Sequence, residues 1–451
     1  MKLYSTNNRN HLVSLKEAVF KGLPEDKGLY MPQAIPVLSP GFIRGLRQYS
    51  FQEIGFEIAK HLFDGAIPLP DLKNIIEKSI TFPAPLVALD QEHLFILELF
   101  HGPSLAFKDF GARFMAQLMG YLNRGEDQEL VILVATSGDT GGAVAAGFYD
   151  TPGIRVVILY PSGKVSALQE KQLTTLGGNI TALEINGTFD DCQDLVKKAF
   201  LDQDINTRFR LGSANSINIS RLIPQSFYYF EAYRQVQEIT NSVEPAVVFS
   251  VPSGNFGNLT AGIIAHKMGL PVKHFIAATN ANDIVPKYIE SGRFLPRPSV
   301  RTLSNAMDVG NPSNFSRMLD LFESNAASDE ERSTWNNLRQ KISGFAFDDE
   351  KTKDAIVDIY QRYAYITDPH AAVGYLALLE YLSTEDNTPN ETIGIVLETA
   401  HPSKFKEDMD RILGQEIPVP DRLSVLSQRT KQAYFLGNTY PEFKSWLIKS
   451  L

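Results

Sequence analysis

The feature that most constrains the fold of this chain is a repeated order of apolar strand, glycine-rich turn and helix between residues 94 and about 280. Apolar runs of strand length lie at 94–99, 130–135, 156–160, 180–185, 246–251 and 275–278, with a last one at 393–397. Helical patterns lie between them at 141–149, 166–176, 190–200, 220–237 and 259–267. Because continuous apolar strands alternate with helices, the sequence predicts an α/β fold with parallel sheets covered on both faces.

The chain of 451 residues is long enough for two or three packed units. Proline fixes its own backbone and restrains the residue before it, so Phe82-Pro83-Ala84-Pro85 reads as an extended break. We expect an N-terminal unit of mainly helical pattern at residues 1–82. A central region is expected at 83–404, and a C-terminal segment packed on it at 405–451.

Composition excludes several classes of function. A net charge of -9 argues against a dedicated binder of nucleic acids or anionic membranes, because such binders need a basic surface. The single cysteine, Cys192, excludes an internal disulfide and a thiolate zinc site and fits a reducing cytoplasm. No histidine pair has the spacing HExxH, so metal catalysis is not expected. No signal core and no run of membrane-spanning length is seen, so we expect a cytoplasmic protein.

Two glycine-rich turns in the strand-helix pattern resemble each other. Residues 135–142 read Ala-Thr-Ser-Gly-Asp-Thr-Gly-Gly, and residues 251–258 read Val-Pro-Ser-Gly-Asn-Phe-Gly-Asn. Glycines let backbone N–H groups converge, and the helix that follows adds the positive end of its dipole, so each turn can hold an anion. Both turns follow the carboxyl ends of strands, where open sheets bind ligands. Neither fits GxGxxG or GxxxxGK[ST], which argues against dinucleotides and ATP.

A lysine in apolar surroundings, Lys108, begins a helical pattern after a turn at residues 101–103 and has three phenylalanines within six positions of it. Burial disfavours the ammonium ion, so such a site lowers the pKa of a lysine and makes its neutral amine available for Schiff-base chemistry. An ion pair of Lys108 with Asp109 or Glu98 on a solvated face is the alternative that this stretch leaves open.

A Schiff-base lysine together with two anion-binding turns suggests pyridoxal phosphate and an amino-acid substrate. One turn would hold the cofactor phosphate and the other the substrate carboxylate, and the residues themselves do not decide which is which. Lys164 and Lys171 are rival lysines, but they precede and fall on a helix patterned to face solvent. Lys404 and Lys406 lie in a polar helix start and are expected to be surface charges.

Further motifs lie along nearly the whole chain, at 28–32, 101–110, 135–141, 168–171, 176–179, 213–218 with Arg221, 252–258, 304–308, 368–373 and 398–402. In this order they resemble the threonine synthases, pyridoxal-phosphate enzymes of fold type II, and most of all the longer bacterial and fungal kind. The resemblance implies two open twisted sheet lobes like those of the tryptophan synthase β subunit, with the cofactor between them and a helical N-terminal unit. The smaller lobe is then expected at about 110–240 and the larger at about 83–109 and 241–404.

The resemblance implies that Lys108 forms the Schiff base with pyridoxal 5′-phosphate. It implies that the cofactor phosphate is wrapped by Ser253, Gly254, Asn255, Phe256, Gly257 and Asn258. Asp139 is placed near the cofactor's 3′-oxygen, where many relatives carry asparagine; a carboxylate there needs a shared proton or a different geometry. Thr399 is placed at the pyridine nitrogen, and an ordinary strand-end threonine is its alternative.

For the substrate, the resemblance implies contacts from Thr136, Ser137, Thr140, Ser216 and Arg221. The first three belong to the turn that receives the carboxylate. Ser216 and Arg221 are placed at the substrate phosphate, helped by Thr140 and Asn258, and arginine suits this role through its planar fork of donors. The alternative for Arg221 is an ordinary helix residue in an ion pair.

The activity that the resemblance implies is a carbon-oxygen lyase reaction, the last step of threonine biosynthesis. O-phospho-L-homoserine and water become L-threonine and phosphate by γ-elimination and β-addition of water. A phospho-lyase of the same fold that gives 2-oxobutyrate, and a non-catalytic binder of phosphorylated metabolites, are the alternatives. We expect a monomer or homodimer that takes a small-molecule substrate and binds neither nucleic acid nor membrane.

Overall fold

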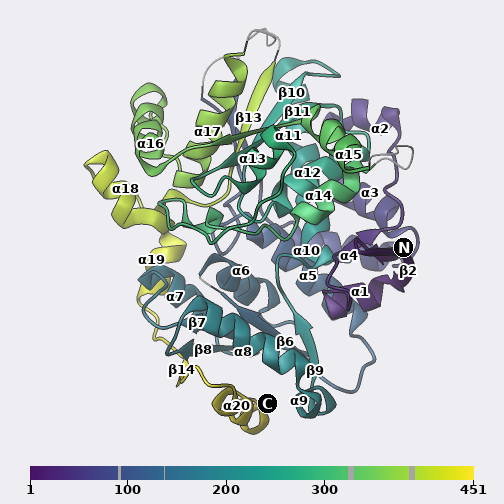
Figure 1. Ribbon diagram of the computed structural model, residues 1–451, viewed down its shortest axis with the longest axis vertical. Helices are drawn as coiled ribbons and strands as arrows, with labels where there is room; N and C mark the ends of the chain where they lie inside the picture. The colour runs from purple at the N-terminus through teal and green to yellow at the C-terminus, as the bar shows by residue number, and fades with distance from the viewer. Residues whose placement is uncertain (90–92, 137, 324–329, 385–391) are drawn as a thin grey trace.

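The computed structural model describes residues 1–89, 93–136, 138–323, 330–384 and 392–451. It contains a three-stranded, a six-stranded and a five-stranded sheet. The six-stranded sheet lies in the upper half of the view in Figure 1 and the five-stranded sheet in the lower half, with helices packed around both. This is the predicted α/β architecture of two open sheets.

The first 80 residues contain both strands and helices. Their antiparallel sheet has the order β2-β1-β3, with β1 (Lys2–Ser5), β2 (Asn8–Ser14) and β3 (Tyr30–Pro32). Their helices are α1 (Leu15–Lys21), α2 (Pro40–Arg44), η1 (Leu46–Gln48), α3 (Phe51–Phe63) and α4 (Leu69–Ser79). Ser50 and Glu53 form a capping box that fixes the start of α3. The helical pattern and a short strand at Lys2–Ser5 are both expected from the sequence and are confirmed, whereas β2 and β3 are additions.

The six-stranded sheet has the order β12-β11-β10-β13-β5-β4, and all its pairs are parallel except β4 with β5. Its strands are β4 (Leu86–Ala88), β5 (Leu94–Glu98), β10 (Val247–Pro252), β11 (Val272–Thr279), β12 (Ile342–Ala346) and β13 (Ile393–Glu398). Its helices are α12 (Gly257–Lys267), α13 (Ile284–Ser291), η3 (Asn305–Met307), α14 (Phe315–Phe322), α15 (Glu330–Arg339), α16 (Asp349–Tyr363) and α17 (Pro369–Leu382). The late strand β13 lies between β10 and β5, so the ends of three strands from distant parts of the sequence meet at one edge.

The five-stranded sheet is parallel throughout, in the order β14-β8-β7-β6-β9. Its strands are β6 (Leu130–Ala135), β7 (Ile154–Pro161), β8 (Ile180–Ile185), β9 (Arg210–Ser213) and β14 (Tyr434–Leu436). Its helices are α5 (Lys108–Leu122), α6 (Asp139–Phe148), α7 (Ala167–Thr174), α8 (Phe189–Leu201) and α9 (Gln203–Arg208). The helix predicted at 220–237 is divided into α10 (Ile219–Leu222), η2 (Ile223–Ser226) and α11 (Phe227–Thr240), and Pro224, which lacks an N–H, lies at the division.

The C-terminal segment reaches both large sheets. It follows the turn η4 (Pro402–Phe405) and contains α18 (Lys406–Leu413), α19 (Asp421–Ser427), β14 and α20 (Tyr440–Ser450). Figure 1 shows α18 beside the upper lobe and α20 beneath the lower one. Arg422 donates to the carbonyls of His101 and Gly102 at 2.9 and 2.8 Å, so this segment also supports the turn before Lys108.

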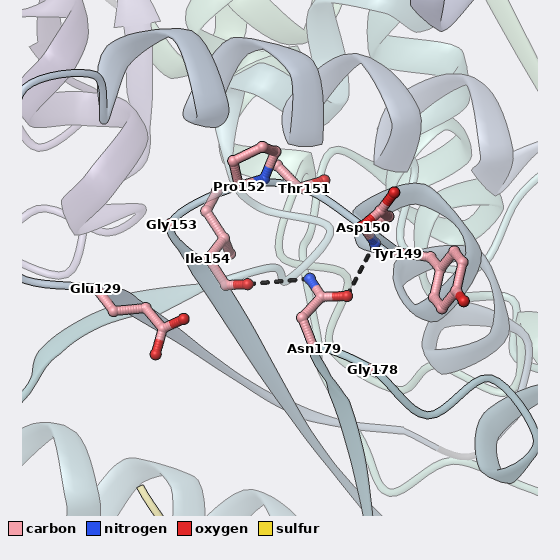
Figure 2. A pocket seen from close by; sticks show the side chains of 9 residues that line it. All are labelled: Glu129, Tyr149, Asp150, Thr151, Pro152, Gly153, Ile154, Gly178 and Asn179. Atoms are coloured by element: carbon pink, nitrogen blue, oxygen red, sulfur yellow. Dashed lines mark hydrogen bonds between the residues drawn. The ribbon is translucent and has the colours of Figure 1, made fainter.

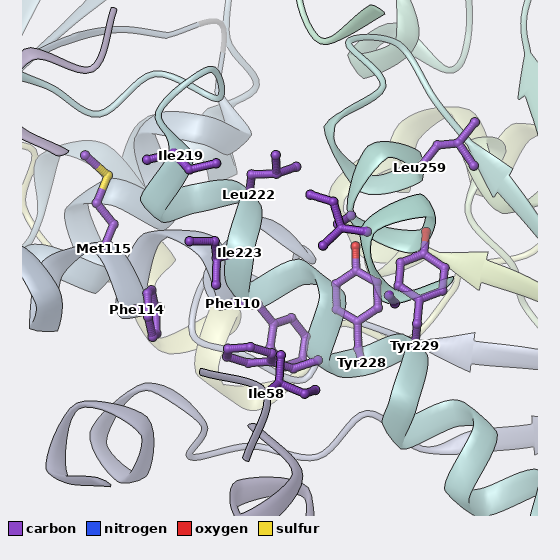
Figure 3. Close-up of a cluster of buried hydrophobic side chains, with 14 of the residues drawn as sticks. Ile58, Phe110, Phe114, Met115, Ile219, Leu222, Ile223, Tyr228, Tyr229 and Leu259 are labelled. Atoms are coloured by element: carbon purple, nitrogen blue, oxygen red, sulfur yellow. The ribbon is translucent and has the colours of Figure 1, made fainter. Parts of the chain in front are cut away.

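A buried apolar cluster joins the N-terminal unit to both lobes. Figure 3 shows part of this cluster: Phe110, Phe114 and Met115 of α5 lie with Ile58 of α3 and with residues of α10 and α11, and Leu259 of α12 extends the cluster beyond Tyr229. Burial of each large apolar side chain contributes about 1.5–3 kcal/mol relative to exposure. The helix that begins with Lys108 is therefore held from several sides. Among the described helices, none has both the length and the apolar character needed to cross a membrane.

Candidate active site

Lys108 is the first residue of α5, at the edge where β5, β10 and β13 end. The segment before it is bound to the end of β13: the N–H of Leu99 donates to the Glu398 carbonyl at 3.0 Å, and that of Phe107 to the Thr399 carbonyl at 2.9 Å. These bonds bring Lys108 and Thr399 together although they lie far apart in the sequence.

The amine of Lys108 lies in a mostly buried, charged environment. Its side chain is 16% exposed, and its Nζ lies 3.5 Å from Oδ2 of Asp139. Burial lowers the pKa of Lys108; Asp139 opposes this shift, whereas the positive charges of Lys404 and Arg221 add to it. Lys108 therefore reaches its neutral form at a pH nearer to the physiological value than a lysine on the protein surface would.

The ion pairs considered for Lys108 with Asp109 and Glu98 are not formed. Asp109 accepts a hydrogen bond from the N–H of Ser104 at 2.8 Å, and burial raises the pKa of its carboxyl to about 6. Glu98 lies 2.7 Å from His101 and accepts from the hydroxyl of Tyr365 at 2.8 Å. Both carboxyl groups are therefore engaged away from the Lys108 amine.

The first glycine-rich turn, residues 136–142, is named the charged turn because it contains Asp139. Oγ1 of Thr136 accepts from the N–H groups of Gly138 and Gly141 at 3.0 and 2.8 Å, which holds the start of α6. Oδ1 of Asp139 accepts from Nε2 of Gln169 at 3.1 Å. Thr140 is half-buried, and Ser137 lies outside the described residues.

Lys404 also binds Asp139, which corrects the prediction that it is a surface charge. Its side chain is 0% exposed, and its Nζ lies 2.6 Å from Oδ1 of Asp139 and 2.9 Å from the carbonyl of Ser104. The 3₁₀ turn η4 directs this lysine inward, whereas Lys406 begins α18 and pairs with Asp410. The sequence predicted a surface position because Lys404 lies among polar residues at a helix start, and no local pattern shows that η4 turns its side chain inward.

The charges around Asp139 keep its carboxyl ionised. Burial alone would raise its pKa, but the ammonium groups of Lys404 and Lys108 outweigh burial and hold the pKa well below its usual range. The charged turn is therefore a fixed negative point between two lysines.

The second glycine-rich turn, residues 253–258, contains no charged residue and is named the neutral turn. Oγ of Ser253 donates to Oδ1 of Asn258 at 2.9 Å. Asn255 donates to the hydroxyl of Ser216 at 2.8 Å and accepts from the N–H of Ser313 at 2.6 Å. The neutral turn thus has the same position after a strand as the charged turn, but its side chains bind only neutral groups.

Backbone geometry makes the neutral turn tight. Phe256 is in the left-handed region, with φ 59°, immediately before α12 begins at Gly257. A Cβ on Gly254 would lie 2.7 Å from Cα of Met307 and 2.9 Å from the carbonyl oxygen of Ala306. Glycine is therefore required at position 254 by the close approach of another backbone.

Arg221 is a buried guanidinium without an anionic partner among the described residues. It is 3% exposed, and its Nη1 donates to the Ala214 carbonyl at 2.8 Å. Its Nε has no hydrogen-bond partner, and burial lowers its pKa to about 10. The ion pair considered as its structural role is not formed, and an unsatisfied buried donor is costly unless an anion completes it.

Thr399 follows β13 and is buried, at 6% exposure. Its chain neighbours Glu398 and Ala400 belong to a cluster of carboxyl groups that sequence reasoning missed. Tyr365 donates to Glu398, and the N–H groups of Asp368 and Ala400 donate to Glu398 and Asp368 at 3.0 and 3.1 Å. Burial, with the charge of Asp368, raises the pKa of Glu398 well above its usual range. Asp368 directly precedes Pro369 at the start of α17, a helix-start signal from which this acid could have been singled out.

A cavity lies elsewhere, away from Lys108 and the two turns. It has a volume of about 360 Å³ and is lined by Glu129, Tyr149, Asp150, Thr151, Pro152, Gly153, Ile154, Gly178 and Asn179 (Figure 2). Ile154 begins β7 and Asn179 precedes β8, so this cavity lies at the amino ends of the strands. Asn179 binds the Ile154 carbonyl and the Asp150 N–H there, both at 2.9 Å, as a structural residue. The candidate active site is at the opposite ends of the strands.

The residues around Lys108 and in the neutral turn fit pyridoxal phosphate. A mostly buried amine with a lowered pKa suits its aldehyde, and a turn too tight for a Cβ suits its phosphate. A family model described as pyridoxal-phosphate dependent enzyme matches residues 79–398. The chain therefore belongs to the pyridoxal-phosphate-dependent enzymes.

More specific matches cover the rest of the chain. Models described as threonine synthase N terminus and threonine synthase, C-terminal match residues 2–80 and 371–445. A threonine synthase of Haemophilus influenzae is 46% identical over 450 residues, covering 100% of each chain. The crystal structure of threonine synthase from Escherichia coli matches with TM-score 0.88 and 42% identity, covering 100% of each chain. A structure of PLP-bound threonine synthase from Brucella melitensis matches with TM-score 0.90 and 34% identity, covering 99% of this chain and 98% of that one. Within its class, this chain belongs to the threonine synthase family.

Proposed function

We propose that this chain converts O-phospho-L-homoserine and water into L-threonine and phosphate. The observation that carries the proposal is the position of Lys108, whose amine lies 3.5 Å from Asp139 of the charged turn, on a chain of the threonine synthase family. The reaction needs an amine that can exchange protons and two sites for anionic groups.

The residues that would hold the cofactor are Lys108, Asp139, Thr399 and the neutral turn. The neutral turn has uncharged side chains and leads into the start of a helix, and both features suit a phosphate dianion. When bound, pyridoxal phosphate supplies the electron sink for carbanions next to the substrate's amino group. The hydroxyl of Thr399 can contact a ring nitrogen without forcing its protonation.

The substrate phosphate is assigned to Arg221 and Ser216, with help from Thr140 and Asn258. Arg221 offers an unpartnered buried Nε, and Ser216 is positioned by its hydrogen bond from Asn255. The substrate carboxylate is assigned to Thr136, Ser137 and Thr140 of the charged turn, on the family resemblance alone. In this arrangement the two anionic ends of the substrate have separate sites.

Lys108 is assigned the proton transfers. Once released as a neutral amine, it would take a proton from the α carbon and move protons at the β carbon, while its lowered pKa keeps the neutral form accessible. Phosphate leaves from the γ carbon and the oxygen of water adds at the β carbon, so the overall reaction needs no redox partner.

The division of the chain is part of the proposal: residues 1–82, the catalytic region 83–404 with its two lobes, and the segment 405–451. A cytoplasmic location and a monomer or homodimer belong to it as well. Sedimentation of the purified protein would distinguish the two oligomeric states.

Product analysis tests the proposed reaction. The cofactor-loaded protein is incubated with O-phospho-L-homoserine, and threonine, 2-oxobutyrate and phosphate are quantified. We expect one threonine for each phosphate released. If 2-oxobutyrate and ammonia were the main products, the proposal would be replaced by that of a phospho-lyase.

A further inference from the structure

The second lysine at Asp139 is a feature that the proposed function does not use. Lys404 comes from η4, more than 290 positions after Lys108, yet both amines bind the same carboxylate: Lys404 at 2.6 Å from Oδ1 and Lys108 at 3.5 Å from Oδ2. The shorter contact belongs to the lysine with no exposed side-chain surface. Lys404 is therefore the primary ion-pair partner of Asp139.

The charged groups that face this pair come from several elements. Asp139 is on α6, Lys108 and Asp109 are on α5, and Arg221 is on α10. Gln169 of α7 is the neutral donor that completes Oδ1 of Asp139. Two lysines thus flank one ionised carboxylate, the charge of Arg221 acts on Lys108, and Asp109 is bound to the Ser104 N–H. The balance of charge is positive, which favours a neutral form of one amine.

We propose that Lys404 is a positioning residue that takes up the charge of Asp139 and so leaves the amine of Lys108 free to react with the cofactor aldehyde. This inference rests on the proposed function. In the reaction, the nitrogen of Lys108 forms a C=N bond to the aldehyde carbon, and the carbonyl oxygen leaves with the two amine hydrogens as water. Lys404 does not touch the reacting atoms; it acts through Asp139.

The physical reason is competition for one carboxylate. Without the ammonium of Lys404, Asp139 would have Lys108 as its remaining lysine partner, and the attraction would hold Lys108 protonated. A nearby opposite charge shifts the pKa of a buried group by about 1–3 units. The hydrogen bond of Lys404 to the Ser104 carbonyl anchors its amine, so the competition is built into the fold.

The test follows cofactor capture by the full-length, cofactor-free protein. Pyridoxal phosphate is added over a range of pH, and the rate at which the visible absorption of the bound cofactor appears is measured. The variants are Lys404→Gln, Lys404→Arg and Asp139→Asn. Lys406→Gln is the matched control, because Lys406 lies two positions away and pairs with Asp410.

We expect Lys404→Gln to move the midpoint of the rate profile upward by about one pH unit, so that capture below the midpoint is about tenfold slower with the same plateau. Lys404→Arg keeps the charge and should retain the wild-type midpoint. Asp139→Asn removes the carboxylate and should move the midpoint downward. Lys406→Gln should match the wild type.

A Lys404→Gln profile that superimposes on the wild-type profile would overturn the inference while leaving the proposed function intact. A wild-type protein that captures no cofactor would instead overturn the proposed function. If Lys404→Gln does not fold, the double variant Asp139→Asn with Lys404→Gln carries the test. Because Lys404 acts through Asp139, the midpoint of the double variant should match that of Asp139→Asn alone, and a midpoint well above it would also overturn the inference.

Discussion

The charged turn and the neutral turn have the same sequence design, a strand followed by Ser-Gly-Asp or Ser-Gly-Asn and a helix, but their environments differ in charge. Asp139 is held between Lys108 and Lys404, whereas Asn255 binds the hydroxyl of Ser216 and the N–H of Ser313. One carboxylate in place of one amide thus separates a turn that organises amines from a turn that can accept a phosphate. Two anion-binding turns of similar sequence therefore need not bind similar anions.

The largest expected effect concerns the amine next to the charged turn. Lys108→Ala should lower turnover by at least about 10³-fold, because general acid-base catalysis and the covalent attachment are both lost. Phosphate release is measured with the melting temperature, which should stay close to that of the wild type. Lys164→Ala is the control, since Lys164 is exposed. Wild-type turnover in Lys108→Ala would contradict the assignment of Lys108 as the amine that binds the cofactor and transfers protons.

A carboxylate introduced into the neutral turn tests whether its lack of charge matters for phosphate binding. Asn255→Asp should weaken pyridoxal phosphate binding by about 10²-fold, because like charges placed together cost several kcal/mol. Equilibrium dialysis measures the affinity, and Asn10→Asp, an exposed position, controls for the added charge. Unchanged affinity in Asn255→Asp would mean that the cofactor phosphate is held elsewhere.

A variant of Arg221 tests whether this residue binds the substrate phosphate and not the cofactor phosphate. Arg221→Ala should raise KM for O-phospho-L-homoserine by about 10–10²-fold, from the loss of a charge-assisted contact, with a smaller change in cofactor affinity.

The contrast is Arg317, another fully buried arginine, whose donors bind the carbonyls of Tyr30 and Ile217 and the side chain of Asn314. Arg317→Ala should mainly lower the melting temperature. The same KM change in both variants would indicate a general loss of structure and not a substrate contact.

The smallest expected effect concerns packing within the turns. Gly254→Ala places a Cβ against the backbone at Met307 and should lower the free energy of unfolding by about 1–3 kcal/mol.

Gly142→Ala, in the charged turn, meets only the side chain of Gln172, whose Oε1 lies 3.3 Å away and can shift, so the loss of stability should be smaller. Gly41→Ala, in α2, has no neighbouring atom nearer than 4.0 Å and serves as the control. Urea unfolding measures all three variants, and a greater loss in Gly142→Ala would show that the backbone contact at Gly254 is not limiting.

Much of this architecture could be predicted from the sequence because it is local. The strands at 130–135 and 180–185 have the predicted bounds, and α5 begins at the predicted lysine. Local apolar runs and turn residues carry that information. The two glycine-rich turns were also found, since their glycines and strand ends are local signals.

The parts that sequence reasoning missed depend on distant contacts. β14 adds to β8 from the far end of the chain, and Lys404 reaches Asp139 from a 3₁₀ turn that reads as polar surface. The charged turn is paired with distant lysines, and the neutral turn binds partners such as Ser216. No pattern within either turn specifies these partners. Tertiary partners, and not local periodicity, therefore decide the electrostatics of this site.

The most direct test of the central claim is borohydride trapping of the cofactor-loaded protein, followed by proteolysis and mass spectrometry of the labelled peptide. We expect one pyridoxyl phosphate group per chain, attached to Lys108. Attachment to the buried neighbour Lys404, or label spread over exposed lysines, would contradict it.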